Sequence, residues 1–235
     1  MDDKTAVITG GTRGIGRAIA AAFVDAGATV VICGRDGTAV DETVGELNDH
    51  ADGDDEPVSG LRVDVRDEYE VERLMEHAAR RGGDIDLVVA NAAVNHGTPG
   101  EMPTHEESYS RFDDTMRTNV RGVFTTVKEA VPHLASEARI LVPSGSVARK
   151  AKAGMGAYAV SKAGAEAVAR GFAVDLEQPV CVVDPGLVAT DLTGIEKARD
   201  PDEIAPMYLW VASEADPDEI DGEIIDLKTW KRSTR

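Results

Sequence analysis

Tyr158 and Lys162 stand four residues apart, at the start of a stretch rich in alanine and glycine. In an α-helix this spacing puts the phenol and the ammonium on one face, about one turn apart. A nearby cation favours the phenolate, so we expect the lysine to lower the pKa of Tyr158 from its usual value of about 10. Such a tyrosine can exchange a proton with a substrate oxygen near neutral pH. Without other motifs around it, the pair is better explained as an incidental tyrosine and lysine on a surface helix.

A glycine-rich turn follows the first strand-like run of the chain and opens a helical stretch. Three glycines allow the backbone to turn tightly and to approach a pyrophosphate, which then sits at the positive end of the helix. Because the turn directly joins the first strand to the first helix, it predicts dinucleotide binding rather than an ordinary βα turn. The residues of the turn expected to bind the cofactor are Gly10, Thr12, Arg13, Gly14, Ile15 and Gly16.

The end of the second strand-like run indicates which dinucleotide is bound. Sites for NAD usually have a carboxylate there that binds the ribose 2′-hydroxyl. This chain has Gly34 at that position, followed by Arg35 and Asp36. Arg13 is expected on the same side of the ribose, and two guanidinium groups can each donate paired hydrogen bonds to a 2′-phosphate. The residues therefore predict NADP(H) rather than NAD(H), with a solvated loop cation as the alternative for Arg35 and with Asp36 as an opposing charge.

Seven motifs occur in one order along almost the whole chain. They are the glycine turn, Asp64-Val65, Ala90-Asn91-Ala92-Ala93, Asn119, the serines before the tyrosine, the Tyr158–Lys162 run and Asp184-Pro185-Gly186. In type, order and approximate spacing, they resemble the motifs of the short-chain dehydrogenase/reductase family. The resemblance implies an oxidoreductase that moves a hydride between NADP(H) and a carbonyl or alcohol carbon.

The resemblance also implies a role for each matching residue. Tyr158 corresponds to the catalytic acid/base, and Lys162 to its electrostatic partner, which also binds the nicotinamide ribose. Both are also expected to contact the cofactor. Asn119 matches the residue that holds a water linking the lysine to solvent. The other matches are cofactor contacts: Asp64 and Val65 at the adenine, Asn91 and Ala92 on the adenosine side, and Pro185, Gly186, Val188 and Thr190 at the nicotinamide carboxamide.

The chain departs from the family's pattern in two places. The usual Asn-Asn-Ala-Gly segment is Ala90–Ala93 here, so the turn lacks a glycine and one amide. The serine that binds the substrate oxygen and stabilises the developing oxyanion usually falls on the position of Gly145. Ser146 needs a loop one residue shorter and continues as the family segment does, so it is the predicted catalytic serine. Ser144 needs one extra loop residue and remains the alternative.

The elements that must position these residues alternate between short β-branched runs and longer helical stretches, a pattern typical of a parallel sheet covered on both faces. The predicted strands are Thr5–Thr9, Thr29–Cys33, Val58–Val63, Ile85–Ala90, Arg139–Val142, Val180–Val183 and Glu223–Leu227. The predicted helices are Gly14–Ala26, Ala39–Asn48, Glu68–Arg80, Ser108–Leu134, Ala157–Leu176 and Asp202–Ser213. Right-handed crossovers give a three-layer, doubly wound α/β Rossmann fold of about seven strands. Residues 1–235 are predicted to form one domain that includes the substrate site, with the acidic stretch His50–Glu56 as a loop.

The charge of the chain limits its partners. The sequence has 43 acidic residues against 25 lysines and arginines, a formal net charge of −18. Such a chain repels nucleic acids and anionic membranes, so neither is an expected partner. No apolar run approaches the ~18 residues of a membrane span, and no signal-peptide pattern occurs, which favours a cytoplasmic protein. Dispersed carboxylates with few lysines suggest a halophilic surface, adapted to a high-salt cytoplasm.

Other polar residues carry weaker signals. None of the five histidines has a partner at metal-ligand spacing, so no metal site is expected. His96 follows the fourth strand and is either a solvated loop side chain or a substrate contact. The basic run Arg149–Lys152 borders the expected active site, where it is either a solvated loop or an attraction for an anionic ligand.

Together these inferences predict an NADPH-dependent reductase of a small or medium carbonyl compound, with Tyr158 supplying the proton and Ser146 polarising the oxygen. An alternative is a reductase of 3-oxoacyl thioesters. An alternative of another class is a regulatory protein that senses NADP(H) without turnover. Assembly as in the resembled family implies a homodimer or homotetramer, paired through the helical stretches Ser108–Leu134 and Ala157–Leu176.

Overall fold

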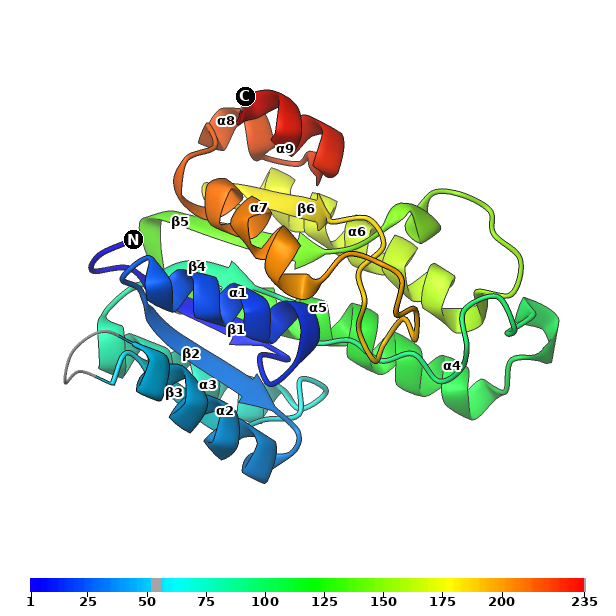
Figure 1. Ribbon diagram of the computed structural model, residues 1–235, viewed down its shortest axis with the longest axis horizontal. Coiled ribbons are helices and arrows are strands. Elements are labelled where there is room, and N and C mark those ends of the chain that lie inside the picture. The colour runs from blue at the N-terminus through cyan, green and yellow to red at the C-terminus, as the bar shows by residue number, and fades with distance from the viewer. Residues whose placement is uncertain (52–55, 235) are drawn as a thin grey trace.

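The computed structural model of the chain describes residues 1–51 and 56–234 (Figure 1). A seven-stranded sheet runs through it in the order β3-β2-β1-β4-β5-β6-β7, with every neighbouring pair parallel. The strands are β1 Thr5–Thr9, β2 Thr29–Gly34, β3 Val58–Arg62, β4 Ile85–Val89, β5 Leu134–Pro143, β6 Val180–Asp184 and β7 Ile224–Asp226. The predicted doubly wound α/β sheet is therefore confirmed. The strand order reverses between β1 and β4, and ligands of such sheets bind at the carboxyl ends of the strands beside that point.

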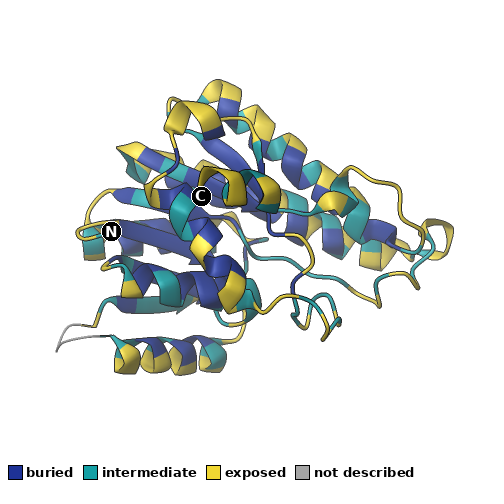
Figure 2. Ribbon diagram, turned by 45° about the horizontal axis from the view of Figure 1, so that its top comes forward, coloured by how far each residue is buried: buried dark blue, intermediate teal, exposed yellow. Residues whose placement is uncertain are grey.

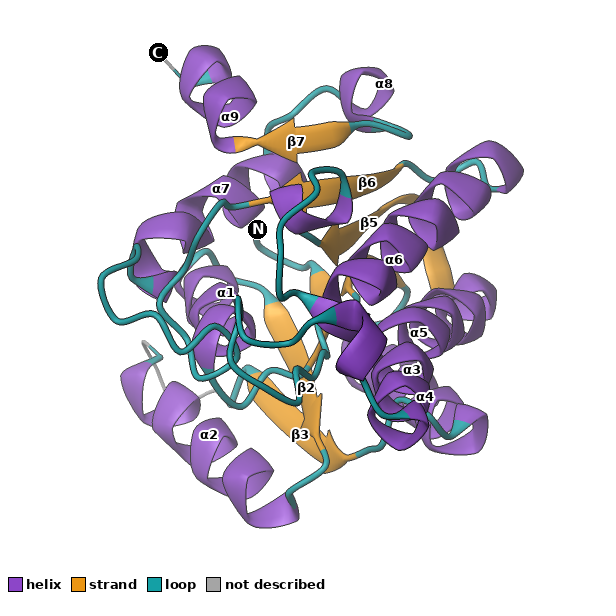
Figure 3. Cartoon of the chain, turned by 90° about the vertical axis from the view of Figure 1, so that its right-hand side faces the viewer, coloured by secondary structure: helices purple, strands orange, loops and turns teal. Residues whose placement is uncertain are grey.

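Helices cover both faces of the sheet (Figure 3). They are α1 Gly14–Asp25, α2 Gly37–His50, α3 Glu68–Gly82, α4 Tyr109–Met116, α5 Gly122–Ala130, α6 Gly156–Asp175, α7 Pro201–Ser213, α8 Pro217–Ile220 and α9 Leu227–Ser233. One face packs against α1, α2 and α7, and the other against α3, α5 and α6. Side chains alternate along β2, so that Val30 and Ile32 enter one core while Val31 and Cys33 enter the other. Figure 2 shows the consequence, a buried sheet between helices that are exposed on their outer sides.

The stretch Ser108–Leu134, predicted as one helix, is divided. It contains α4, a π turn over Arg117–Arg121, α5 and a short 3-10 turn over Val131–His133. Leu134 then begins β5 and pairs with Ile85 of β4 across a register shift, so this strand starts earlier than the predicted Arg139. A π turn holds one extra residue per hydrogen-bonded loop and is frequent at functional sites. Asn119 lies in the middle of this one.

The acidic stretch His50–Glu56, predicted as a loop, lies mostly outside the described residues. His50 itself is the last residue of α2. Over residues 1–51 and 56–234, no helix is both long and apolar enough to cross a membrane.

Candidate active site

A cleft of about 560 Å³ opens at the carboxyl edge of the sheet, among the segments that follow β1, β2, β3, β4 and β6. Most of the predicted cofactor contacts line it: Gly10, Thr12, Arg13, Gly14, Ile15, Gly16, Arg35, Val65, Asn91, Ala92 and Thr190. Six predicted contacts are outside its lining: Asp64, Tyr158, Lys162, Pro185, Gly186 and Val188. The structure thus joins the glycine turn to the segments after β4 and β6, as the sequence predicts.

The glycine turn has the shape that a pyrophosphate requires. Gly10 and Gly14 have φ of +66° and +53°, conformations that other residues rarely adopt. A Cβ on Gly16 would lie 2.2 Å from the carbonyl oxygen of Gly10, so only glycine fits there. Arg13, the N-cap residue of α1, makes no capping hydrogen bond with its side chain within residues 1–51 and 56–234, and the first amides of α1 therefore remain available to an anion.

Asn91 supports this turn from the neighbouring strand. Its Nδ2 donates to the carbonyl oxygens of Thr9 at 2.9 Å and Gly10 at 3.1 Å. The amide of Ala92 donates to Thr9 Oγ1 at 3.1 Å. Ala93 replaces the family's glycine without strain, because Asp3 is the only non-glycine residue with positive φ in the described part of the chain. Asn91 therefore holds the turn in place, in addition to lining the cleft.

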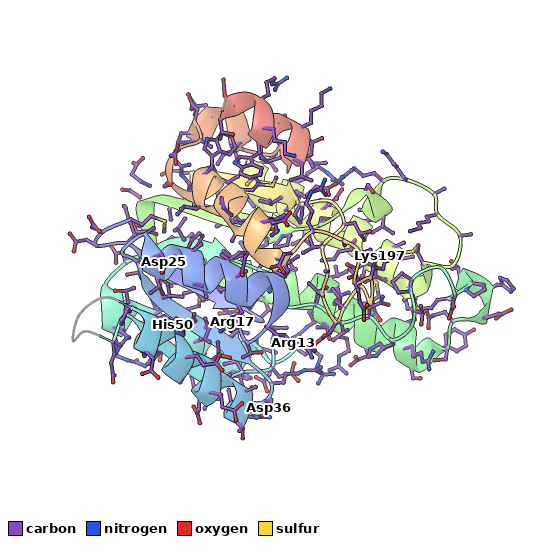
Figure 4. The ribbon with its side chains drawn as sticks, viewed as in Figure 1. Arg13, Arg17, Asp25, Asp36, His50 and Lys197 are labelled. Atoms are coloured by element: carbon purple, nitrogen blue, oxygen red, sulfur yellow. The ribbon has the colours of Figure 1, made fainter. Side chains whose placement is uncertain are left out.

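The side of the cleft that follows β1 and β2 carries exposed cations. Arg35 is exposed and lines the cleft. Arg13 Nη1 lies 3.2 Å from Asp191 Oδ2, and both side chains are 78% exposed. Asp36 carries the negative charge that the sequence analysis set against a bound 2′-phosphate. Its side chain caps α2 by accepting hydrogen bonds from the amides of Thr38 and Ala39. Figure 4 shows Arg13 and Asp36 at the same edge of the sheet.

Asp64 is held by an arginine beside the cleft. Arg66 Nε lies 2.9 Å from both carboxylate oxygens of Asp64 and holds the pKa of that carboxyl below its usual range. Arg66 also pairs with Asp114, which lies 2.7 Å from His96 Nε2. His96 is therefore bonded to α4 rather than simply solvated. The adjacent Val63 and Val65 line the cleft in place of the carboxylate.

Thr118 is a further polar residue of the cleft, one that the sequence motifs did not single out. It is 4% exposed, and its Oγ1 has no hydrogen-bond partner within residues 1–51 and 56–234. A buried hydroxyl that lines a cleft without a partner is suited to bind a polar group of a ligand. With the glycine turn and the uncapped α1, it makes the cleft a good fit for a dinucleotide.

Tyr158 and Lys162 lie in the first turns of α6, close to Asn119. Lys162 Nζ is 5.8 Å from the centre of the Tyr158 ring and donates to the carbonyl oxygen of Pro143 at 3.0 Å. Asn119 Nδ2 donates to Ser161 Oγ at 2.9 Å, and Ser161 Oγ donates to the carbonyl oxygen of Tyr158 at 2.8 Å. The three predicted residues are thus brought together.

Two residues that the sequence analysis missed complete this arrangement. Asn119 exchanges hydrogen bonds with both backbone groups of Val94, at 2.8 and 2.9 Å, and Val94 lines the cleft. Ser161 is fully buried, and its hydrogen bonds with Asn119 and with the carbonyl oxygen of Tyr158 join the π turn to α6. A serine between a tyrosine and a lysine of one helix was the available signal for Ser161.

Burial gives Tyr158 and Lys162 pKa values that differ from those expected from the sequence. It raises the pKa of Tyr158 to about 12, so the prediction that Lys162 lowers it is wrong for the protein alone. Burial lowers the pKa of Lys162 to about 8, against the opposing effect of the Glu166 carboxylate. The Lys162 ammonium lies over the Tyr158 ring and donates to the Pro143 carbonyl oxygen. Tyr158 is consequently a phenol near neutral pH, able to donate its proton.

The two candidate serines have different surroundings. Ser144 Oγ donates to Glu166 Oε1 at 2.7 Å. Ser146 begins the 3-10 turn Ser146–Ala148 and is exposed, and its hydroxyl has no hydrogen bond within the described ranges. Ser146 is therefore free to bind a substrate oxygen, whereas Ser144 is already engaged.

Comparison with known proteins gives concordant matches. A family model described as short chain dehydrogenase matches residues 4–200. The L-fucose dehydrogenase of Oryctolagus cuniculus is 34% identical over 206 residues, which cover 85% of this chain and 68% of that protein. A solved 3-ketoacyl-(acyl-carrier-protein) reductase of Brucella melitensis, complexed with NADH, has 25% identity and a TM-score of 0.85 over 96% of this chain and 97% of its own. A solved short chain dehydrogenase of Burkholderia cenocepacia, in complex with NADP, has 26% identity and a TM-score of 0.82 over 97% of each chain.

Proposed function

The chain belongs to the short-chain dehydrogenase family and is an oxidoreductase that interconverts a carbonyl and an alcohol, and from this premise we propose that it is an NADPH-dependent reductase of a small or medium carbonyl compound. The observation that carries the proposal is the bonded group of Asn119, Ser161 and Tyr158, with Lys162 against the tyrosine ring. This group lies beside a cleft shaped for a dinucleotide.

The proposed chemistry divides the work among a few side chains. A nicotinamide cofactor bound in the cleft supplies the hydride. Ser146 donates a hydrogen bond to the substrate oxygen and stabilises the charge that develops there. Tyr158, protonated near neutral pH, transfers its proton to the same oxygen. Lys162 holds a positive charge beside the phenolate that remains, and Asn119 fixes the helix turn next to them.

The preference for NADP(H) rests on the adenosine end of the cleft. Arg13 and Arg35 are exposed there, and Gly34 replaces the carboxylate that binds a 2′-hydroxyl. Asp36 is occupied in capping α2 and so presents less of an obstacle to a phosphate. Of the two solved relatives described above, one is complexed with NADP and the other with NADH, so the preference depends on these residues of the chain itself.

A cofactor-oxidation screen tests the proposal. The purified protein is mixed with NADPH or NADH and a panel of ketones, aldehydes and 3-oxoacyl thioesters, at low and at molar salt. We expect NADPH to be oxidised faster than NADH with at least one carbonyl class, and the rate to fall by at least about 100-fold in Tyr158→Phe. Tight NADPH binding with no oxidation of any panel member would instead support a sensor. Turnover of thioesters alone would identify the 3-oxoacyl alternative.

We also propose that the protein forms a homodimer or a homotetramer. The outer side of α6 exposes a row of small apolar residues at helical spacing, Val160, Ala163, Ala167 and Val174. Phe124 of the neighbouring α5 is 45% exposed and packs against Phe172. Such a face gains free energy when a second copy covers it. Light scattering is expected to give the mass of two or four chains, and Val174→Asp to reduce it.

The remaining proposals concern the chain as a whole. We infer that residues 1–235 act as one domain in a cytoplasm of high salt, because one sheet carries the whole site and the net charge is −18. Unfolding with and without molar salt tests the adaptation, since screening of the dispersed carboxylates should raise the melting temperature. Equal stability in both conditions would contradict it.

A further inference from the structure

Arg149 does not belong to an exposed basic patch with its neighbours. Arg149, Lys150 and Lys152 are all exposed as residues, but the Arg149 guanidinium bridges two buried carboxylates. One is Glu166 of α6 and the other is Asp184, the last residue of β6. The side chains of these carboxylates are only 3% and 8% exposed, whereas that of Arg149 is 31% exposed.

Each carboxylate also binds a second part of the site. Glu166 Oε1 accepts the hydroxyl of Ser144 at 2.7 Å, at the start of the loop that carries Ser146. Asp184 Oδ1 accepts the amide of Gly186 at 3.0 Å, in the turn that follows β6. The guanidinium thus links three segments that lie side by side in Figure 1: the loop after β5, α6 and the end of β6.

These three segments are the ones that carry the reaction. The loop holds Ser146, α6 holds Tyr158 and Lys162, and the turn after β6 precedes Thr190 in the cleft. Glu166 stands one helical turn beyond Lys162, and its charge acts on the ammonium. The positive charges of Lys162 and Arg149 are therefore balanced by the negative charges of Glu166 and Asp184.

We propose that Arg149 is a positioning residue of the proposed reductase, which fixes the Ser146 loop against α6 and β6 by pairing with Glu166 and Asp184. The inference rests on the proposed function, in which the Ser146 hydroxyl and the Tyr158 phenol must meet at one substrate oxygen. A planar guanidinium suits this task because it can bond two carboxylates at once, which an ammonium on a flexible stem does less well. Displacement of a catalytic group by about 1 Å can cost on the order of 100-fold in rate.

The test replaces the guanidinium and keeps the length of the side chain, in Arg149→Met. We expect kcat to fall by about 10- to 100-fold, while the dissociation constant of NADPH changes by less than about threefold, because the adenosine end is untouched. Arg149→Lys, which keeps the charge, is expected to recover part of kcat. The matched control is Arg80→Met, which removes a surface ion pair with Glu76 on α3 and should change neither quantity.

A second readout does not depend on turnover. Hydrogen exchange is expected to become at least about tenfold faster at the amides of Ser144–Lys150 and of Gly186 in Arg149→Met, with the amides of β1 and α1 unchanged. If the wild-type protein reduces no carbonyl but this local change occurs, the proposed function fails and the positioning contact stands. Uniformly faster exchange, or unchanged exchange and kcat, would overturn the proposal for Arg149. If Arg149→Met does not fold, Arg149→Lys and Glu166→Gln decide by the same two measurements.

Discussion

The proposed site has an adenosine end inside the cleft and a reaction end beside it, and the two are built by different means. At the adenosine end, the binding groups are the backbone of a glycine turn, the uncapped amides of α1 and exposed arginines such as Arg13. At the reaction end, they are buried side chains: Asn119 and Ser161, which are bonded to each other, and Lys162, which is bonded to the carbonyl oxygen of Pro143. The adenosine end depends on the conformations that the backbone can adopt, and the reaction end on which polar side chains can be buried together.

Because of this difference, substitutions at the two ends should have different effects on cofactor binding and on kcat. Exposed cations interact with a ligand through water and are screened by salt, so a change to one of them should alter binding by a modest factor. Buried polar groups leave unpaired partners behind when they are removed, so changes at the reaction end should have larger effects. Substitutions at one end should therefore change kcat with little change in cofactor binding, and those at the other end should do the reverse.

The largest effect is expected for Tyr158→Phe, which removes the proton donor and keeps the ring. We expect kcat to fall by roughly 100- to 10,000-fold, the range for loss of a general acid, with NADPH binding unchanged. Steady-state rates and a fluorescence titration of NADPH measure the two quantities. Tyr109→Phe, at a tyrosine that is 90% exposed, is the matched control and should retain full activity.

A somewhat smaller effect is expected for Ser146→Ala. Loss of one donor to the oxyanion typically lowers kcat by about 100- to 1,000-fold. Ser144→Ala removes a hydrogen bond to Glu166 instead and should lower kcat less. Comparison of kcat between the two variants checks the assignment, and the reverse order would make Ser144 the catalytic serine.

A stability measurement tests how much free energy it costs to bury the charged Lys162 ammonium at the reaction end. Burial lowers the pKa of Lys162 from 10.5 to about 8, so the charged lysine destabilises the folded state by up to about 3 kcal/mol below pH 8. This cost disappears as the folded lysine loses its proton, between pH 8 and 10.5. Lys162→Met is therefore expected to raise the free energy of unfolding at pH 7 while abolishing activity.

Denaturant unfolding from pH 7 to pH 10 measures this effect, and the advantage of Lys162→Met should be nearly constant up to about pH 8 and shrink above it. Lys231→Met, at an exposed lysine of α9, provides the control and should show no such trend. An advantage that stayed constant with pH would mean that the effect comes from packing rather than from charge.

The same division explains what the sequence could predict. The strands and the glycine turn were predictable because β-branched runs and glycines at fixed spacing are constraints on the backbone, and β1 was located residue for residue. The catalytic set was predictable only through its resemblance to a known family. The raised pKa of Tyr158 and the pairing of Arg149 with two buried carboxylates were not, because both depend on burial among segments far apart in the chain. The π turn around Asn119 was missed because helical periodicity continues through it.

The smallest predicted effect lies at the adenosine end, in Arg35→Ala. Loss of one charged hydrogen-bonding partner of a 2′-phosphate costs on the order of 1.5 kcal/mol, which is about tenfold in the KM for NADPH. The KM for NADH, which lacks that phosphate, should stay the same, as should kcat with either cofactor. The loss should also diminish in molar salt, since Arg35 is exposed and its field is screened there. If Arg35→Ala lowered kcat equally with NADPH and NADH, the arginine would be acting on the reaction end, and the proposed separation of the two ends would not hold.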